Sequence, residues 1–246
     1  MKHGVYVREQ KTSVSTPVVA ESGVPFVVGT APVHSAESPA ALFTPVLCTD
    51  WEDAVKKLGY SDDWKTYTIC EVMYSHFKLF QRQPIIFCNV LDPSTNKEAV
   101  AGAEVTLSGK QAKLPFDAIL SSLVVKTASS SESPLVKDTD YAAYYSDGNL
   151  IVETIEDGAA KAATKLYISY DKIKTADIDD DDIVKGIEAI DLCMATVSTT
   201  PDLIIAPGWS HTSTVQAVMA AKAILTAPPT ARAAMTPSPR RSPRRT

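Results

Sequence analysis

Four short stretches of this chain carry residue types that can do chemistry. The first is the apolar run SGVPFVVGTAP, residues 22–32, in which Gly29 and Thr30 follow five apolar positions. A glycine turn after a strand can hold a phosphate, but a P-loop closes with Lys-Ser or Lys-Thr and a dinucleotide fingerprint has three glycines before a helix. Neither signature is present, and Pro32 follows directly. We therefore interpret Gly29 as the turn that ends a buried strand.

The second stretch is DIDDDDIVKGIE, residues 177–188, which is rich in carboxylates. With Asp177 as position 1, Asp179 and Asp181 take positions 3 and 5 and Glu188 takes position 12. This is the spacing of an EF-hand calcium loop, so these four residues are the candidate metal ligands.

Two features of the same stretch favour another interpretation. Position 6 of an EF-hand loop requires glycine for a sharp turn, and this chain has Asp182 there. The residues before it, KLYISYDKI, alternate like a strand and do not predict the helix that should precede the loop. We therefore expect a helix start, with Asp180 or Asp181 accepting backbone N–H groups ahead of Ile183. Calcium binding stays open as an alternative.

The third stretch is APGWSHTS, which sets Ser210 beside His211. A serine hydrolase would show the nucleophile elbow G-x-S-x-G, and adjacent residues rarely form a serine–base pair. We expect His211 to lie at the surface or to cap a helix. His76 lies on the apolar face of an expected helix, where a core or subunit-contact role is commoner than catalysis. No catalytic residue and no cofactor are predicted.

The fourth stretch is the basic end, TPSPRRSPRRT. Five of the seven arginines lie there, at positions 232, 240, 241, 244 and 245. Removing them from the 24 basic residues leaves 19 against 29 acidic residues, so the rest of the chain carries a net charge near −10. Paired arginines can follow a phosphate backbone, which keeps a nucleic-acid-binding module open as an alternative. The tail has no apolar residue to bury, and we expect it to be disordered.

Composition excludes several classes of protein. The chain has 246 residues, 45% hydrophobic and 22% charged, which suits a globular protein with its own core. No apolar run is long enough to cross a bilayer, and the N-terminus lacks a secretion signal. The four cysteines, Cys48, Cys70, Cys88 and Cys193, are widely spaced in apolar surroundings without a CxxC pair. This spacing predicts reduced, buried thiols and neither disulfides nor zinc.

Apolar periodicity divides the chain into segments of different character. GVYVREQ alternates at period two with no local partner, as an extended arm would. Apolar strands and amphipathic helices follow, including a helix with Ile69, Val72, Met73, His76, Phe77 and Phe80 on one face. After Asp92 the apolar residues again occupy every second position, as in a strand, and Asp147-Gly148 indicates a tight hairpin. The helical period resumes at Ile183, followed by an expected buried strand PDLIIAPG and a helix STVQAVMAAKAIL.

We therefore predict an α/β domain, in a mixed α/β and α+β class, interrupted by a small antiparallel β domain. The expected divisions are an extended N-terminal arm at 1–22, a first α/β part at 23–100, a β-sandwich insertion at 101–172, an α/β continuation at 173–226, and a Pro/Arg-rich tail at 227–246.

The order of these segments resembles a known family. The chain is similar to the tail sheath proteins of contractile bacteriophages and tailocins. The similarity lies in the order HGVYVREQ, SGVPFVVGTAP, the helix and PIIFCNVL, a β insertion, and GIEAIDLCMATVSTTPDLIIAPG. The resemblance covers residues 3 to about 225. It implies a subtilisin-like α/β core without a working protease site, and a structural subunit that is not an enzyme.

The resemblance also implies partners. Sheath subunits form hexameric rings that stack helically around a tail tube protein, between baseplate and tail terminator proteins, in a virion assembled in the bacterial cytoplasm. Extended arms add strands to a neighbour's sheet, and the matching donor residues here are Gly4, Val5, Tyr6, Val7, Arg8 and Glu9. Neither a membrane nor a specific nucleic acid is expected as a partner.

The C-terminal end departs from the family pattern. The subtilisin-like domain of sheath proteins continues well beyond the position of Leu225 and ends in a C-terminal arm, whereas this chain ends in TAPPTARAAMTPSPRRSPRRT. A truncated or altered end would leave part of an apolar layer uncovered and remove one partner of the strand exchange. The expectation is that the chain stays small or forms irregular oligomers. A serine hydrolase remains the least favoured alternative.

Overall fold

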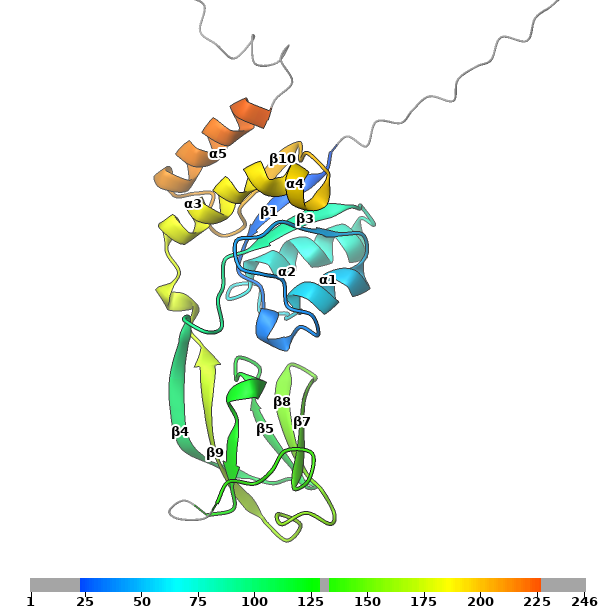
Figure 1. Cartoon of the computed structure of the whole chain (residues 1–246), viewed down its shortest axis with the longest axis vertical. Helices are drawn as coiled ribbons and strands as arrows, with labels where there is room; N and C mark the ends of the chain where they lie inside the picture. The colour runs from blue at the N-terminus through cyan, green and yellow to red at the C-terminus, as the bar shows by residue number, and fades with distance from the viewer. Residues whose placement is uncertain (1–22, 129–132, 227–246) are drawn as a thin grey trace, which may run out of the picture.

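The computed structural model describes residues 23–128 and 133–226, which form two stacked bodies (Figure 1). One body is an α/β domain that holds both ends of the described chain, and the other is an antiparallel β domain inserted between them. Strand β4 (Lys97–Thr106) leads the chain from the α/β domain into the β domain, and β9 (Lys165–Ile173) leads it back; the two strands pair with each other. The chain therefore has the predicted mixed α/β class.

A four-stranded sheet, in the order β10-β1-β3-β2, forms the centre of the α/β domain. Its strands are β1 (Pro25–Gly29), β2 (Val46–Cys48), β3 (Ile85–Asn89) and β10 (Leu203–Ile205). β1 runs parallel to β3 and to β10, whereas β2 is antiparallel to β3. Every residue of β1 and β3 is buried. Both strands are covered on two faces, which is why they read as unbroken apolar runs.

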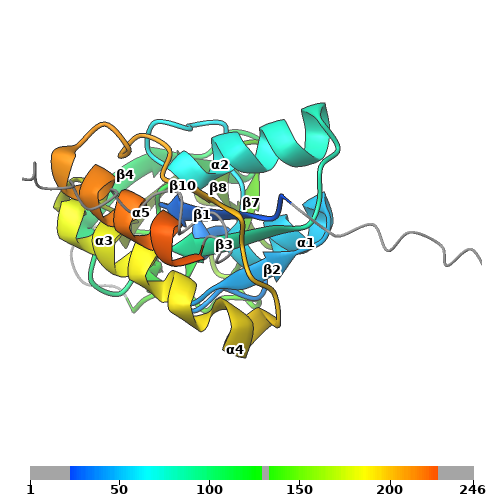
Figure 2. The same ribbon diagram turned by 90° about the horizontal axis from the view of Figure 1, so that it is seen from above.

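Helices cover both faces of this sheet (Figure 2). They are α1 (Trp51–Leu58) and α2 (Thr68–Met73) on one face, and α3 (Asp180–Glu188), α4 (Cys193–Val197) and α5 (Ser213–Thr226) on the other. Side chains alternate along β1, so that Phe26 and Val28 pack towards α3 while Val27 packs towards α1 and α2. The sheet thus separates two hydrophobic clusters.

Both ends of α1 carry capping residues. Asp50 is its N-cap, because an Asp50 carboxylate oxygen accepts the backbone N–H of Asp53 at 2.8 Å. Gly59 ends the helix with φ near 72°, and its N–H donates to the carbonyl of Val55. Capping residues of the expected types therefore fix both ends of this short helix.

Helix α2 departs from the predicted face. Ile69, Met73 and Phe77 are buried as expected, but α2 passes into a π-helical segment, Tyr74–Leu79, and Phe80 is 69% exposed. A π turn holds more residues than an α turn, so a spacing counted at 3.6 residues per turn loses register there. The prediction that Phe80 belongs to the buried face was wrong for this reason.

Close packing of α3 on the sheet depends on one glycine. A Cβ atom at Gly186 would lie 2.5 Å from Cγ1 of Val28 and 2.7 Å from Cγ1 of Val90. Glycine costs a helix about 1 kcal/mol relative to alanine, so its presence here is explained by this approach to β1 and β3. The contact brings Ile183 and Ile187 fully into the core.

The inserted domain consists of two antiparallel three-stranded sheets, β4-β9-β6 and β5-β8-β7. The remaining strands are β5 (Gln111–Pro115), β6 (Val124–Lys126), β7 (Tyr141–Ser146) and β8 (Asn149–Thr154). The predicted hairpin is confirmed, because Ser146 pairs with Asn149 and the two residues between them, Asp147 and Gly148, both have positive φ. Strand pairing begins at Lys97 and ends at Ile173.

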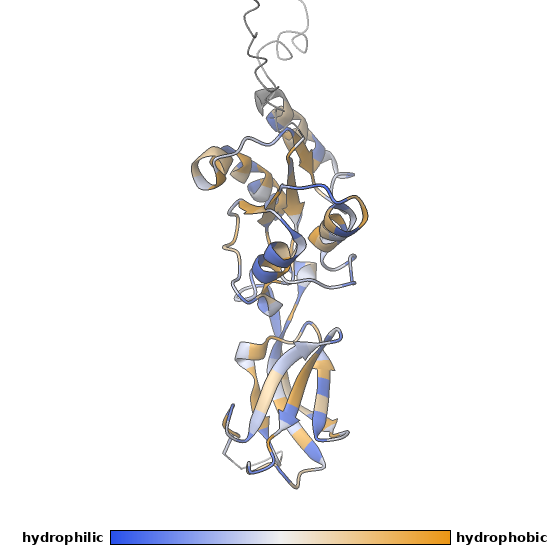
Figure 3. Ribbon diagram, turned by 90° about the vertical axis from the view of Figure 1, so that its right-hand side faces the viewer, coloured by the Kyte–Doolittle hydropathy of each residue, from blue (hydrophilic) through white to orange (hydrophobic). Residues whose placement is uncertain are grey.

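Leu114, Leu150, Leu166 and Ile168 come from both sheets of the insertion and meet in one core. Charged residues next to them on the same strands, such as Lys113 and Lys165, are exposed. Colouring by hydropathy shows this alternation in the strands of the insertion, in contrast to the more uniformly hydrophobic central strands of the α/β domain (Figure 3). The insertion thus has its own hydrophobic centre and meets the α/β domain only at one end (Figure 1).

Candidate functional site

A cleft of about 570 Å³ opens at the carboxyl ends of β1 and β10. These adjacent parallel strands lead to opposite faces of the sheet, β1 towards α1 and α2 and β10 towards α5. Such a switch point is where open α/β sheets place their ligand crevices. The walls include Trp64 and Lys65 from the loop before α2, and Gly208 and Trp209 from the turn after β10.

The floor of this cleft shows what Gly29 and Thr30 do. The Thr30 N–H donates to Oγ1 of Thr68 at 3.2 Å, the Thr68 N–H donates to Oγ1 of Thr30 at 3.0 Å, and the Thr30 hydroxyl donates to the carbonyl of Thr66. The next amide, that of Ala31, donates to the Asn89 side chain. The amides that a phosphate would need are therefore occupied by protein side chains.

Gly29 has a packing role at the same place. A Cβ atom at this position would lie 2.4 Å from Oγ1 of Thr68, so only glycine lets the start of α2 approach β1 closely enough to form these bonds. The interpretation of Gly29 as the residue that ends a buried strand agrees with this geometry. The threonine pair fastens α2 to the end of β1.

The carboxylate stretch does not have the geometry of a calcium loop. The N-cap of α3 is Asp179, which accepts the N–H groups of Asp181 and Asp182 at 3.0 and 3.2 Å. The prediction of a capped helix was right, but the choice of Asp180 or Asp181 was wrong. The cap lies one residue earlier because Asp179 still has extended backbone, whereas Asp180 is already helical.

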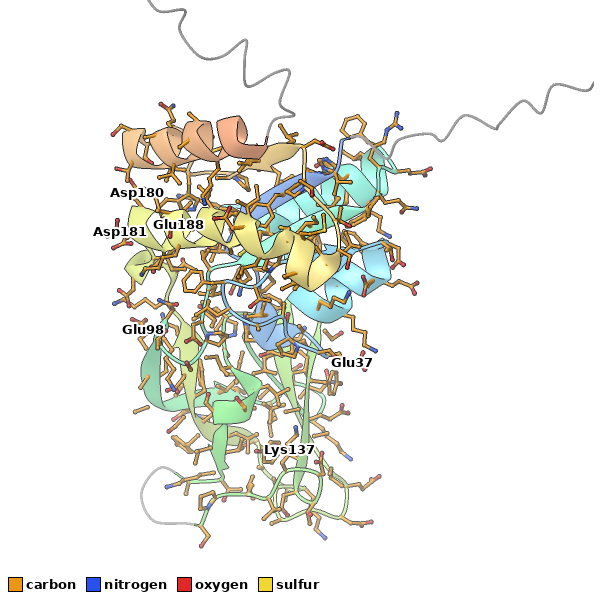
Figure 4. All side chains as sticks on the ribbon, turned by 45° about the horizontal axis from the view of Figure 1, so that its top comes forward. Glu37, Glu98, Lys137, Asp180, Asp181 and Glu188 are labelled. Atoms are coloured by element: carbon orange, nitrogen blue, oxygen red, sulfur yellow. The ribbon has the colours of Figure 1, made fainter. Side chains whose placement is uncertain are left out.

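The four candidate calcium ligands are also spread out along α3 and the turn before it. Asp177 pairs with Lys174 in the turn before the helix, and Glu188 ends α3 (Figure 4). Asp181 and Glu188 are seven helical steps apart, about 10 Å along the axis, whereas ligands of one calcium ion all lie within about 2.6 Å of it. Among the described residues, no group of three His, Cys, Asp or Glu side chains is placed to hold a metal.

Ser210 and His211 are both exposed, as predicted for His211. Ser210 lies in the turn after β10, where its N–H donates to the carbonyl of Ala206, and within the described chain no hydrogen bond joins its hydroxyl to a histidine. His76 is half-buried, and its Nδ1 lies 3.2 Å from the carbonyl of Val72 within its own helix. These residues are not brought together.

All four cysteines are free and buried, which confirms the prediction. Burial raises the pKa of the Cys193 thiol to about 11 and that of the other three to about 12. Because the thiolate is the reactive form, these side chains act as core hydrophobes near neutral pH.

The exposed edge of the α/β sheet is a feature that sequence reasoning missed. PDLIIAPG was expected to be a buried strand, but β10 is an edge strand and Leu203 is 53% exposed. The reason is that, within the described chain, β10 has a neighbour on one side only, which is β1. A short apolar run has the same sequence pattern in a central strand and in an edge strand, so no local signal separates the two.

The start of the described chain lies against this edge. The Gly23 N–H donates to a carboxylate oxygen of Asp202 at 2.7 Å, and the Asp202 N–H donates to the carbonyl of Val24 at 2.9 Å. The preceding residues, including the predicted donor segment from Gly4 to Glu9, lie outside the described part of the chain, as does the arginine-rich tail. Within the described residues, no helix has both the length and the apolar character needed to span a bilayer.

The joint between the two domains is built from aromatic side chains. His34 and Tyr67 come from the α/β domain, and Phe116 and Tyr145 come from the insertion. The His34 ring lies 5.4 Å from Phe116, 5.8 Å from Tyr145 and 6.0 Å from Tyr67, measured between ring centroids. No periodicity links residues so far apart in sequence, so this cluster could be found only from the fold.

A hydrogen bond fixes the orientation of His34 in the joint. Nε2 of His34 lies 3.0 Å from the carbonyl oxygen of Phe116, and a carbonyl can only accept, so Nε2 carries the hydrogen. Burial lowers the pKa of His34 to about 4, with the Phe116 carbonyl acting in the opposite direction. Near neutral pH the ring is therefore uncharged, with a lone pair on Nδ1.

Comparison with known proteins gave no match to a protein-family model, to a curated protein or to a solved structure.

Proposed function

We propose that this chain is a structural subunit of a contractile tail sheath, from a bacteriophage, prophage or tailocin, which polymerises around a tail tube. The observation that carries the proposal is the open edge at β10, beside the point where the chain enters the sheet at Gly23. Unpaired strand edges accept further strands from other chains, so a protein that presents one must either protect it or use it. A sheath subunit uses it for assembly.

The edge has main-chain groups ready for an added strand. The Asp202 N–H points to β1, where it donates to Val24. In the parallel ladder Phe26 pairs with Ile204, so Leu203 and Ile205 direct their N–H groups towards β1, whereas Ile204 directs its N–H and carbonyl away from β1. The exposed Leu203 side chain adds apolar area at the same place. Strand addition would satisfy these groups by main-chain hydrogen bonds, which give affinity without demanding a particular sequence.

The remaining parts of the proposal follow from the resemblance in sequence. The donated strand is the segment from Gly4 to Glu9 of a neighbouring copy, and the α/β domain is a subtilisin-like core used as a scaffold. Subunits form hexameric rings stacked along the tube protein, between baseplate and terminator. Main-chain links through extended arms would keep neighbouring subunits connected while they rotate during contraction.

Substitutions at β10 test whether the edge carries assembly. Ile204→Pro removes the N–H that β10 directs away from β1, and Pro is tolerated on the free side of an edge strand. Ile204→Ala removes the same apolar side chain but keeps the N–H, so it is the matched control. Sedimentation velocity on the full chain should show concentration-dependent oligomers that Ile204→Pro abolishes and Ile204→Ala only weakens.

Negative-stain electron microscopy then separates a sheath from other oligomers. Six-fold rings or tubes formed by the full chain would support the proposal. Oligomers that Ile204→Pro leaves unchanged would contradict it.

A further inference from the structure

We infer that the joint between the two domains contains a buried water-binding site, formed by Nδ1 of His34, the hydroxyl of Tyr67 and Oδ1 of Asp117. The inference concerns the link between the domains and does not depend on the proposed sheath function. It starts from a count of hydrogen-bond partners. Within the described chain, the buried side-chain polar atoms that lack any partner are these three.

The three residues lie together at the joint. The rings of His34 and Tyr67 are 6.0 Å apart, and both pack against Phe116, the residue before Asp117. The Asp117 carboxylate is close enough to Tyr67 to help raise the pKa of its hydroxyl, although burial is the main cause. His34 and Tyr67 lie in the α/β domain and Asp117 lies in the insertion, so a group bound between them connects the two domains.

Unpaired buried polar atoms are uncommon in folded proteins. Nine in ten or more find a partner, and each one that does not costs about 1 to 3 kcal/mol. Tyr67 is only 2% exposed, so bulk solvent does not reach its hydroxyl. Three such atoms around one joint would cost a large part of a domain's stability, which is typically about 5 to 15 kcal/mol. A bound polar molecule removes this cost.

The chemistry of the three atoms selects water. Because Nε2 of His34 donates to Phe116, Nδ1 can only accept. As a carboxylate oxygen, Oδ1 of Asp117 also accepts, while the Tyr67 hydroxyl has a hydrogen to donate. Water can donate two hydrogen bonds and accept two, so one molecule can serve both acceptors and receive the Tyr67 hydrogen. An ammonium ion has no lone pair for that hydrogen, and buried waters in proteins typically make about three hydrogen bonds.

The neighbouring polar groups of the joint already have partners. The Tyr145 hydroxyl donates to the carbonyl of Ala118 at 2.7 Å and accepts the N–H of Leu120 at 3.1 Å. This hydroxyl is therefore a control for Tyr67. It belongs to the same aromatic cluster and differs in that its hydrogen bonds are all made within the protein.

The test compares Tyr67→Phe with Tyr145→Phe in the full chain by urea unfolding. If water satisfies the Tyr67 hydroxyl, removing it should raise the unfolding equilibrium constant by about 5-fold, in the range of Tyr145→Phe, since a hydrogen bond contributes about 1 kcal/mol. If that hydroxyl has no partner, Tyr67→Phe removes an unsatisfied group and should leave stability unchanged or increase it. The second result would overturn the inference.

A structural measurement separates water from a direct bond between Tyr67 and Asp117, which would also make Tyr67→Phe destabilising. A high-resolution crystal structure should show a solvent peak within about 3.2 Å of the three atoms. NMR at neutral pH should find His34 in the Nε2–H form. A direct bond without solvent, a metal ion in the peak, or the Nδ1–H form of His34 would each overturn the assignment.

Discussion

Acidification should weaken this protein through His34, by an amount that follows from its burial. The pKa of His34 falls from 6.5 to about 4 in the folded chain because burial disfavours the charged ring. One pKa unit corresponds to about 1.4 kcal/mol, so the folded state loses about 3 kcal/mol relative to the unfolded state as the group is forced to charge. This is a large part of a typical domain stability.

The sign follows from proton binding. Between 6.5 and about 4 the unfolded chain binds more protons at His34 than the folded chain does. The free energy of unfolding therefore falls as pH falls through this window, with full stability above it and no further loss from this group below it. Asp117 acts in the opposite direction, because burial raises its pKa and the folded state takes up that proton first. Tyr67 and Tyr145, the other titratable neighbours, stay neutral because burial raises the pKa of each.

A variant that cannot titrate isolates the contribution of His34. His34→Gln keeps an N–H for the Phe116 carbonyl and an oxygen that accepts, but it has no pKa in this range. Urea unfolding monitored by circular dichroism should show the wild-type chain losing about 3 kcal/mol more than His34→Gln between about pH 7 and pH 4. His211→Gln, at an exposed histidine, should behave like the wild type. Parallel pH profiles for wild type and His34→Gln, or an NMR titration of His34 near its ordinary pKa, would refute the reasoning.

Three further predictions follow from packing, capping and the turn after β10. Gly186→Ala should destabilise the α/β domain by about 1 to 3 kcal/mol in thermal or urea unfolding, because the new methyl group overlaps Val28, and a neutral result would mean that α3 can shift. Asp179→Ala should cost about 0.5 to 2 kcal/mol through loss of the cap, and calorimetry should detect no micromolar calcium binding before or after it. Ser210→Ala and His211→Ala should each leave ester hydrolysis at the background rate, and a wild-type turnover that either one abolishes would reverse the structural assignment.

The sequence by itself determined the features that depend on near neighbours. The unbroken apolar runs of β1 and β3 predict strands covered on both faces, and both are fully buried. Asp50 and Gly59 mark the two ends of α1, and Asp147-Gly148 gives the hairpin between β7 and β8. Each of these signals lies within a few residues of the structure it specifies, so periodicity and capping rules are sufficient to find it.

Sequence reasoning failed where the answer depends on small shifts of the backbone. The π turn after α2 turned Phe80 out of the core, and the cap of α3 lies at Asp179 and not one or two residues later. Several aspartates in a row all have the right side chain for a cap. Only the backbone conformation, which is extended at Asp179 and helical at Asp180, decides which of them accepts the N–H groups.

Tertiary structure alone decided the open edge and the joint. Whether LII at 203–205 becomes a central or an edge strand depends on which strands pair with it, and such pairings join residues almost 180 positions apart, as with Pro25 and Leu203. The joint likewise gathers His34, Tyr67, Asp117 and Tyr145 from separate elements of two domains. Local patterns report burial and conformation over one or two turns. They do not report which distant surfaces meet, so the groups most open to experiment here were set by the fold.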